Sequence, residues 1–227
     1  MTVELIVLDD ERAAARAAGE LLAEAARGGG EIALSGGKTP ERAYETAAKL
    51  QPDWTRVGVW WGDERCVPPD DERSNFSLAK RTLLARVARP PAAIHRIRGE
   101  ADPRQAAAEY DSELRGKRFA LNFLGVGPDG HTASLFPDAP GLDEIERLAL
   151  PAEPRLEPWV PRITLTPPAL ANADLVLFLV AGEAKAEAVA RAFAGPQSRA
   201  TPASLIRSRD GRTLAILDRA AAALLPA

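Results

Sequence analysis

The chain has few of the residues that form covalent or metal cross-links. Among its 227 residues there is one cysteine, Cys66, and there are two histidines, His95 and His131. A single cysteine cannot form an intrachain disulfide, which favours a reducing compartment, and we expect a cytoplasmic protein. One thiol and two separated histidines provide no metal-ligand spacing, so we also expect no metal site.

Long apolar runs and a surplus of basic residues are missing as well. No run approaches the length of a membrane-spanning helix. The apolar stretch 1–8 has the length of a strand, lacks a basic flank and precedes Asp9 and Asp10, unlike a signal peptide. The 29 Lys and Arg residues are outweighed by 32 Asp and Glu, which gives a formal net charge of −3. We therefore expect neither a membrane nor a nucleic-acid partner.

The residues that are present have an ordinary globular composition, 46% hydrophobic and 27% charged. Short β-branched runs alternate with longer segments rich in Ala, Leu, Glu and Arg, a rhythm typical of βαβ units. The predicted strands are 3–8, 32–34, 57–61, 120–124, 175–180 and 214–217. The predicted helices are 11–27, 40–50, 74–87, 103–114 and 183–193.

Strand 175–180 is apolar on both faces, as is typical of a strand covered by helices on both sides. The pattern predicts an α/β fold with a doubly wound, mostly parallel sheet flanked by helices, Rossmann-like and in three layers. Without a linker or repeat, we expect one domain over residues 1–227. The proline-rich segment 137–161 shows neither the helical nor the strand period of apolar residues. It is either a tolerated insertion or a wall or lid beside the site.

The first motif that carries chemistry follows strand 32–34 and opens a helix. Its residues are Ser35, Gly36, Gly37, Lys38, Thr39 and Pro40. Thr39 suits the N-cap and Pro40 the first helical position. Glycines before a helix N-terminus leave N–H groups free for an anion such as phosphate, although a tight strand-to-helix turn explains them equally. A nucleotide P-loop is excluded, because it needs a glycine where this chain has Ile32.

A second motif lies at the end of strand 57–61. It contains Asp63, Glu64 and Arg65, and Asn75 follows after a loop rich in Pro and Asp. In open α/β sheets ligands bind outside the carboxyl ends of strands, where this cluster falls. The alternative is a surface salt-bridge cluster.

A third motif is the glycine-rich segment 125–137, directly after strand 120–124. It carries Gly127, Asp129 and His131. A histidine on such a loop is suited to general-base catalysis, because its ordinary pKa lies near neutrality. The alternative is a histidine that only pins the loop. His95 lies in a mixed apolar stretch and is interpreted as structural.

The fourth motif pairs Arg162 with Lys185. Lys185 stands on the first turn of helix 183–193, where a positive charge opposes the helix dipole. An anion bound between the helix end and the ammonium group would remove that conflict.

In this order the four motifs resemble those of the 6-phosphogluconolactonase family and, more distantly, of glucosamine-6-phosphate deaminases. The resemblance runs from about Ser35 to Lys185. Deaminases continue Asp-Gly-His with an Ile-Ala-Phe-Asn-Glu-Pro run, whose glutamate serves the histidine, whereas this chain continues with Thr-Ala-Ser-Leu-Phe-Pro over 132–137. Lys38 departs from the family, which usually has a small polar residue there.

The resemblance implies hydrolysis of 6-phosphoglucono-1,5-lactone to 6-phosphogluconate, the second step of the oxidative pentose phosphate pathway, without any cofactor. His131 would activate water, Asp129 would orient it, and backbone N–H groups or Arg65 would stabilise the oxyanion. The expected phosphate ligands are Ser35, Gly36, Gly37, Arg162 and Lys185, and the other expected contacts are Lys38, Thr39, Asp63, Asn75 and Gly127. We expect a monomer acting on a small sugar-phosphate lactone. The alternatives are an isomerase or deaminase of the same fold and a non-catalytic sugar-phosphate sensor.

Overall fold

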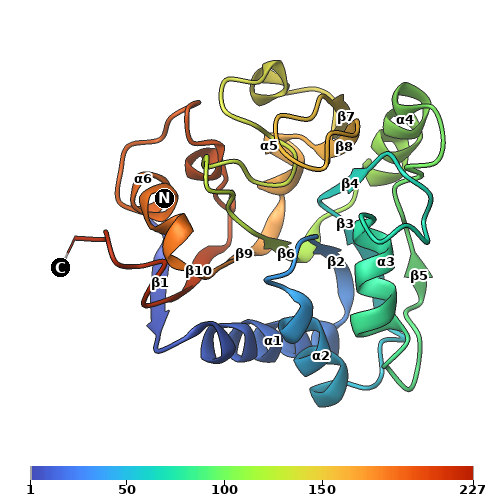
Figure 1. The fold of residues 1–227 in the computed structure, drawn as a ribbon. Coiled ribbons are helices and arrows are strands. Elements are labelled where there is room, and N and C mark those ends of the chain that lie inside the picture. Colours follow the sequence, from blue (N-terminus) through green and yellow to red (C-terminus); the bar gives the residue numbers. More distant parts are fainter. Residues whose placement is uncertain (1, 227) are drawn as a thin grey trace.

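The computed structural model describes residues 2–226. Its centre is a seven-stranded parallel sheet with the strand order β1-β10-β9-β6-β2-β3-β5 (Figure 1). The strands are β1 (Glu4–Leu8), β2 (Gly30–Leu34), β3 (Val57–Trp61), β5 (Ala93–Ile94), β6 (Phe119–Leu124), β9 (Ala173–Val180) and β10 (Arg212–Asp218). All six predicted strands and the parallel α/β architecture are confirmed.

Helices cover both faces of this sheet. In Figure 1, α1 (Glu11–Gly28) and α2 (Glu41–Leu50) lie below the sheet, while α4 (Pro103–Leu114) and α6 (Ala186–Phe193) lie above it. Gly19 lets α1 and α2 approach closely, since a Cβ there would lie 2.6 Å from the carbonyl oxygen of Ala43. The central strands are therefore buried on both sides, as β9 illustrates with its unexposed Leu177 and Phe178.

Strand β1 is less covered than the central strands. It lies at the edge of the sheet and pairs only with β10. Its Leu5, Ile6 and Val7 are exposed by 41–47%. Its apolar sequence thus predicts a strand correctly but not its cover.

Three predicted helices begin or continue differently. Helix α2 begins at Glu41, and Pro40 rather than Thr39 is its N-cap, without a side-chain capping bond, so the N-cap role of Thr39 is wrong. The segment 74–87 forms only a short helix, α3 (Asn75–Ala79), followed by a π-helical turn, Lys80–Leu84. The segment 183–193 likewise divides into a 3₁₀ turn, Glu183–Lys185, and α6.

A small antiparallel sheet above the main one was not predicted. It pairs β4 (Asp63–Arg65) with β8 (Arg162–Leu165), and β8 with β7 (Ala149–Ala152). The segment 137–161 is therefore more than a tolerated insertion, because it supplies β7 and buries Leu142. Strands of three or four residues, one of them interrupted by Pro151, are too short to show a period of two.

The order of strands creates one crevice in the main sheet. From β2 the chain first builds the sheet on one side, through β3 and β5, and then returns to place β6 on the other side. The strand order thus reverses between β2 and β6. Ligands in open α/β sheets bind at such a switch point, outside the carboxyl ends of the strands.

Candidate active site

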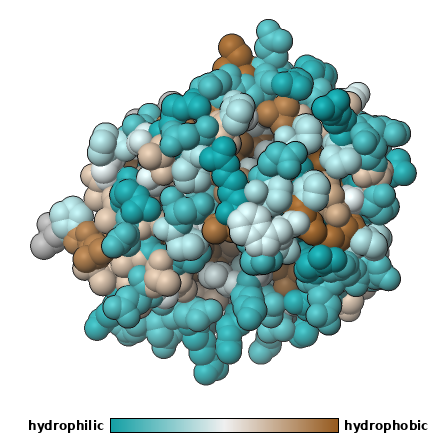
Figure 2. All heavy atoms as spheres, turned by 45° about the horizontal axis from the view of Figure 1, so that its top comes forward, coloured by the Kyte–Doolittle hydropathy of each residue, from teal (hydrophilic) through white to brown (hydrophobic). Residues whose placement is uncertain are grey.

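The predicted motifs converge on a cavity of about 210 Å³ at this switch point. It is bordered by the segments that follow β2, β3, β6 and β9, together with Arg162 of β8. Figure 2 shows the molecule tilted so that the upper side of Figure 1 comes forward, and its surface there is mostly hydrophilic. All predicted site residues border the cavity except Asp129 and Asn75, which stand behind its wall.

The glycine-rich loop after β6 places His131 on the cavity wall. Nδ1 of His131 lies 2.6 Å from Oδ1 of Asp129, whose carboxylate also accepts the backbone N–H of His131. Gly127 permits this arrangement, since a Cβ there would lie 2.0 Å from Nδ1. No partner for Nε2 of His131 is found within residues 2–226, so this nitrogen is available to a ligand.

The surroundings of Asp129 keep it ionised. Burial opposes its charge, but its contacts with His131 outweigh burial and hold the pKa of Asp129 below its ordinary value. An ionised carboxylate at Nδ1 fixes the orientation of the imidazole and stabilises it once protonated. Such an arrangement is chemically suited to proton transfer at Nε2.

The loop after β2 is held from behind by Tyr44 of α2. The buried phenol accepts the N–H of Ser35 at 2.8 Å and donates to the carbonyl of Ser35 at 2.7 Å. Gly37 has φ +90°, which a side chain would disfavour. Within residues 2–226 no backbone hydrogen bond from the N–H of Gly36 or Gly37 is found. The loop is thus fixed in place with free donors, as an anion site requires.

Two arginines lie side by side on the small sheet. Arg65 and Arg162 are neighbours across β4 and β8, and the Nε of each is buried without a hydrogen-bond partner among the described residues, 2–226. Nη2 of Arg162 donates to the carbonyls of Leu156 and Pro158, both at 3.1 Å. Burial, together with the charge of Arg65, lowers the pKa of Arg162. Two cations held at one wall with unused donors favour an anionic ligand.

Lys185 also borders the cavity. Its Nζ donates to the carbonyl of Val126 at 2.5 Å, within the loop that carries His131. Burial lowers the pKa of Lys185, and the carboxylate of Asp129 partly opposes that effect. A desolvated ammonium group that lacks an ion pair gains most from a bound anion.

Asp63 and Asn75 are in contact, but only Asp63 reaches the cavity. Asp63 borders the cavity, whereas Asn75 lies behind it and donates through Nδ2 to the backbone oxygen and Oδ1 of Asp63, at 2.8 and 3.0 Å. The Asn75 side chain also fills the space beside Gly36, where a Cβ would meet its Oδ1 at 1.7 Å. The structure therefore brings Asn75 to the site as a support of its wall.

Several functional positions were missed at the sequence level. Ala133 borders the cavity in a left-handed conformation with φ +50°. The hydroxyl of the buried Ser134 donates a hydrogen bond to the carboxylate of Asp63. Tyr44 braces the Ser35 loop. The sequence did not indicate these roles, because Ser134 and Tyr44 act through contacts with other segments and residue type does not reveal the left-handed conformation of Ala133.

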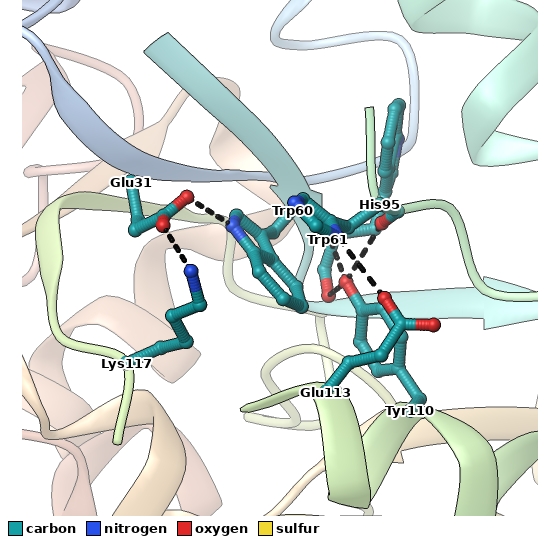
Figure 3. Close-up of polar contacts among 7 residues, drawn as sticks. All are labelled: Glu31, Trp60, Trp61, His95, Tyr110, Glu113 and Lys117. Atoms are coloured by element: carbon teal, nitrogen blue, oxygen red, sulfur yellow. Dashed lines mark hydrogen bonds and ion pairs between the residues drawn. The ribbon is translucent and has the colours of Figure 1, made fainter. Parts of the chain in front are cut away.

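The second histidine lies in a different cluster, in contact with α4 (Figure 3). The imidazole of His95 stacks on Trp60 with ring centroids 3.9 Å apart, and its Nδ1 lies 3.0 Å from Glu113. Trp60 donates to Glu31 at 2.6 Å, and Glu31 pairs with Lys117 at 2.7 Å. His95 thus packs within a structural network and does not border the cavity.

Within residues 2–226, no group of three or more His, Cys, Asp or Glu side chains has a geometry that could hold a metal ion. No helix in that range has the length and apolar character needed to cross a membrane.

Known proteins resemble this chain along most of its length. The sequence profile of the family described as glucosamine-6-phosphate isomerases/6-phosphogluconolactonase matches residues 9–215. A 6-phosphogluconolactonase of Streptomyces coelicolor is 37% identical over 99% of this chain and 95% of its own length. The structure of a 6-phosphogluconolactonase from Trypanosoma brucei has a TM-score of 0.89 and 25% identity, over 99% of both chains. A monomeric glucosamine-6-phosphate deaminase, at 19% identity and a TM-score of 0.83 over 98% of this chain and 100% of its own, shares the fold.

Proposed function

Since the chain belongs to the glucosamine-6-phosphate isomerase/6-phosphogluconolactonase family, we infer that it hydrolyses 6-phosphoglucono-1,5-lactone to 6-phosphogluconate. The observation that carries this assignment is the His131–Asp129 pair, 2.6 Å apart, at a cavity lined by cations that have no ion-pair partner within residues 2–226. The reaction is the second step of the oxidative pentose phosphate pathway. We extend the proposal to a cytoplasmic, monomeric, single-domain enzyme that needs no cofactor, nucleic acid or membrane.

In the proposed mechanism, Nε2 of His131 removes a proton from a water molecule as its oxygen attacks the lactone carbonyl carbon. The negative charge that develops on the carbonyl oxygen is stabilised by Arg65 and by N–H groups of the loop that contains Gly127. The intermediate then collapses and the bond between the carbonyl carbon and the ring oxygen breaks. The imidazolium returns its proton to the ring oxygen, so one water is added and the enzyme is regenerated.

The phosphate group would be held by the N–H groups of the Ser35–Gly37 loop with Arg162 and Lys185. Lys38 and Thr39 follow this loop in the sequence, border the cavity and add a charge and a hydroxyl group to it. Fixing the phosphate positions the carbonyl beside His131 and converts binding energy into orientation. Asp63 is assigned to a sugar hydroxyl, and Asn75 keeps Asp63 in place.

One contact favours a lactonase over a deaminase of the same fold. Five residues after the histidine, where the deaminase run has its glutamate, this chain has Phe136. Its buried ring lies 4.9 Å from the His131 ring, between centroids. Asp129 is the acid that serves His131, so the deaminase arrangement has no counterpart at this position.

The direct test is turnover of 6-phosphogluconolactone by the purified chain, with ammonia release from glucosamine 6-phosphate as the competing assay. We expect lactone hydrolysis well above its spontaneous rate and no ammonia. His131→Ala should lower kcat by about 10²-fold or more, the scale of a positioned acid or base, and leave the Kd of 6-phosphogluconate nearly unchanged. His95→Ala serves as the matched control and should retain kcat. Near-normal turnover by a folded His131→Ala variant would contradict the assigned base, and ligand binding without turnover by the unmodified chain would indicate a sensor.

A further inference from the structure

A strained turn follows His131 directly. The N–H of Leu135 donates to the carbonyl of Thr132 at 3.0 Å, which closes a tight turn with Ala133 and Ser134 at its centre. Ala133 has φ +50°, one of two non-glycine residues with positive φ in residues 2–226, and it borders the cavity. An L-residue pays for this conformation, so contacts from outside the turn must hold it.

Ser134 supplies those contacts. Its side chain is 2% exposed, and its Oγ donates to Oδ2 of Asp63 at 2.6 Å. Its backbone N–H donates to Oγ1 of Thr164 at 3.2 Å. Asp63 and Thr164 face each other across β4 and β8. Both hydrogen bonds of Ser134 therefore connect the turn to one cross-strand pair of the small sheet, Asp63 and Thr164.

The pair of Asp63 and Thr164 is also linked to the segments proposed to hold the phosphate. Asp63 is fixed by Asn75, whose side chain packs against Gly36 in the loop after β2. Thr164 lies two residues after Arg162 on β8. The anchor of the His131 turn and the supports of the phosphate loop thus meet at Asp63.

We propose that Ser134 is a positioning residue, which through Asp63 fixes the distance between His131 and the phosphate-binding groups. This inference rests on the proposed lactonase function. A bond from Ser134 sets the place of the base without contributing to phosphate affinity, because Ser134 belongs to neither the anion loop nor the cationic wall. Loss of the bond lets the strained turn relax, and His131 moves relative to a substrate that is still held by its phosphate.

The test compares Ser134→Ala and Ser134→Cys with Ser208→Ala. Ser208 is a matched control, since it is 1% exposed and donates through Oγ to the carbonyl of Ala173, at the end of the sheet opposite the cavity. The cysteine variant keeps the shape of the side chain with a slightly larger terminal atom and replaces the hydroxyl by a weak donor, so it remains informative if the alanine variant fails to fold.

We expect Ser134→Ala and Ser134→Cys to lower kcat roughly ten- to a hundredfold with KM within about twofold, since small displacements of a reacting group have effects of this size. Ser208→Ala should lower the melting temperature but keep kcat. The positioning role is overturned if the Ser134 variants keep kcat as Ser208→Ala does, or if their loss falls on KM. The lactonase activity of the unmodified chain is measured first. If that activity is absent, the proposed function is contradicted. If the unmodified chain is active and the Ser134 variants keep its kcat, only the positioning role of Ser134 is contradicted.

Discussion

Two glycines, Gly36 and Gly127, allow side chains of the site to approach the backbone closely. Gly127 leaves room for Nδ1 of His131 where its own Cβ would lie, and Gly36 leaves room for Asn75. A methyl group at position 127 would displace the His131 side chain, and one at position 36 would displace the Asn75 side chain. The glycines of this cavity therefore act as spacers as well as turn formers, and the sequence indicates only the second of these uses.

Ala133 is the residue whose substitution we expect to stabilise the protein. The left-handed conformation costs an alanine about 1–2 kcal/mol, while glycine adds only about 0.4–1 kcal/mol of entropy to the unfolded chain. Ala133→Gly should therefore raise the free energy of unfolding by about 0.5–1 kcal/mol, measured by urea denaturation. Ala17→Gly, in the regular helix α1, is the control and should lower it by about 1 kcal/mol. A loss at Ala133 equal to that at Ala17 would show that the turn is not strained.

Residue chemistry made part of the site predictable. His131 and Lys185 stand out because an imidazole on a glycine loop and a cation at a helix start conflict with purely structural roles. Ser134 and Tyr44 do not stand out, since their partners Asp63 and Ser35 lie 71 and nine residues away along the chain. Chemistry is visible in the local sequence, and support by a distant segment is not.

Helix α3 shows how an element of marginal length is kept in place. It spans five residues, Asn75–Ala79, far fewer than an isolated helix needs. The buried carboxylate of Glu64 accepts the N–H groups of Asn75 and Phe76 at 2.7 and 2.8 Å, and the Ser74 hydroxyl at 3.0 Å. Burial raises the pKa of Glu64 against the opposing effect of these donors. The start of α3 is thus held by a side chain from β4.

Replacing this carboxylate should cost far more than an ordinary surface change. Glu64→Gln turns one acceptor oxygen into a donor that faces N–H groups, and we expect the free energy of unfolding to fall by about 2–3 kcal/mol. Glu72→Gln, an exposed neighbour, should change it by less than about 0.5 kcal/mol. Chemical denaturation of both variants measures the difference. Equal effects of the two substitutions would mean that α3 does not depend on Glu64.

Among the elements, length decided what the sequence could predict. β9 and α1 span eight and 18 residues, long enough for a burial pattern to emerge. β4, β7 and β8 have three or four residues and are stabilised by one another. The small sheet that presents Arg65 and Arg162 was therefore invisible, although both arginines were recognised as candidates.

At the scale of the whole molecule, strand order rather than strand identity was beyond prediction. The motifs after β2 and β6 meet because these strands are neighbours at the switch point, although 84 residues separate the end of one from the start of the other. Periodicity carries no information on which strands become neighbours. Only the rule that ligands bind outside the carboxyl ends of parallel strands indicated that the motifs would share one edge.

The distribution of charge in the whole chain opposes that of the cavity. The formal net charge is −3, yet Lys38, Arg65, Arg162 and Lys185 border the cavity with Asp63 as the one carboxylate among its lining residues. Within residues 2–226 none of these four cations forms an ion pair. Concentrated positive charge of this kind attracts an anionic substrate into one site and raises its rate of association.

The phosphate should therefore determine which lactone is hydrolysed. If Lys185 and the Ser35–Gly37 loop bind the same phosphate, Lys185→Ala should weaken transition-state binding of the phosphorylated lactone by about 1.5–3 kcal/mol, the scale of a charged hydrogen bond. Glucono-1,5-lactone, which lacks the phosphate, should be hydrolysed poorly by both proteins, and its kcat/KM should change little.

Steady-state kinetics on both lactones with both proteins measures this selectivity. Lys117→Ala is a matched control, since Lys117 pairs with Glu31 outside the cavity and its loss should leave the ratio of the two kcat/KM values unchanged. Lys185→Ala should narrow the ratio by roughly ten- to a hundredfold, almost entirely through the phosphorylated lactone. Equal proportional losses on both substrates would show that Lys185, through its bond to Val126, supports the His131 loop instead. The phosphate would then be assigned to the Ser35–Gly37 loop and Arg162 alone.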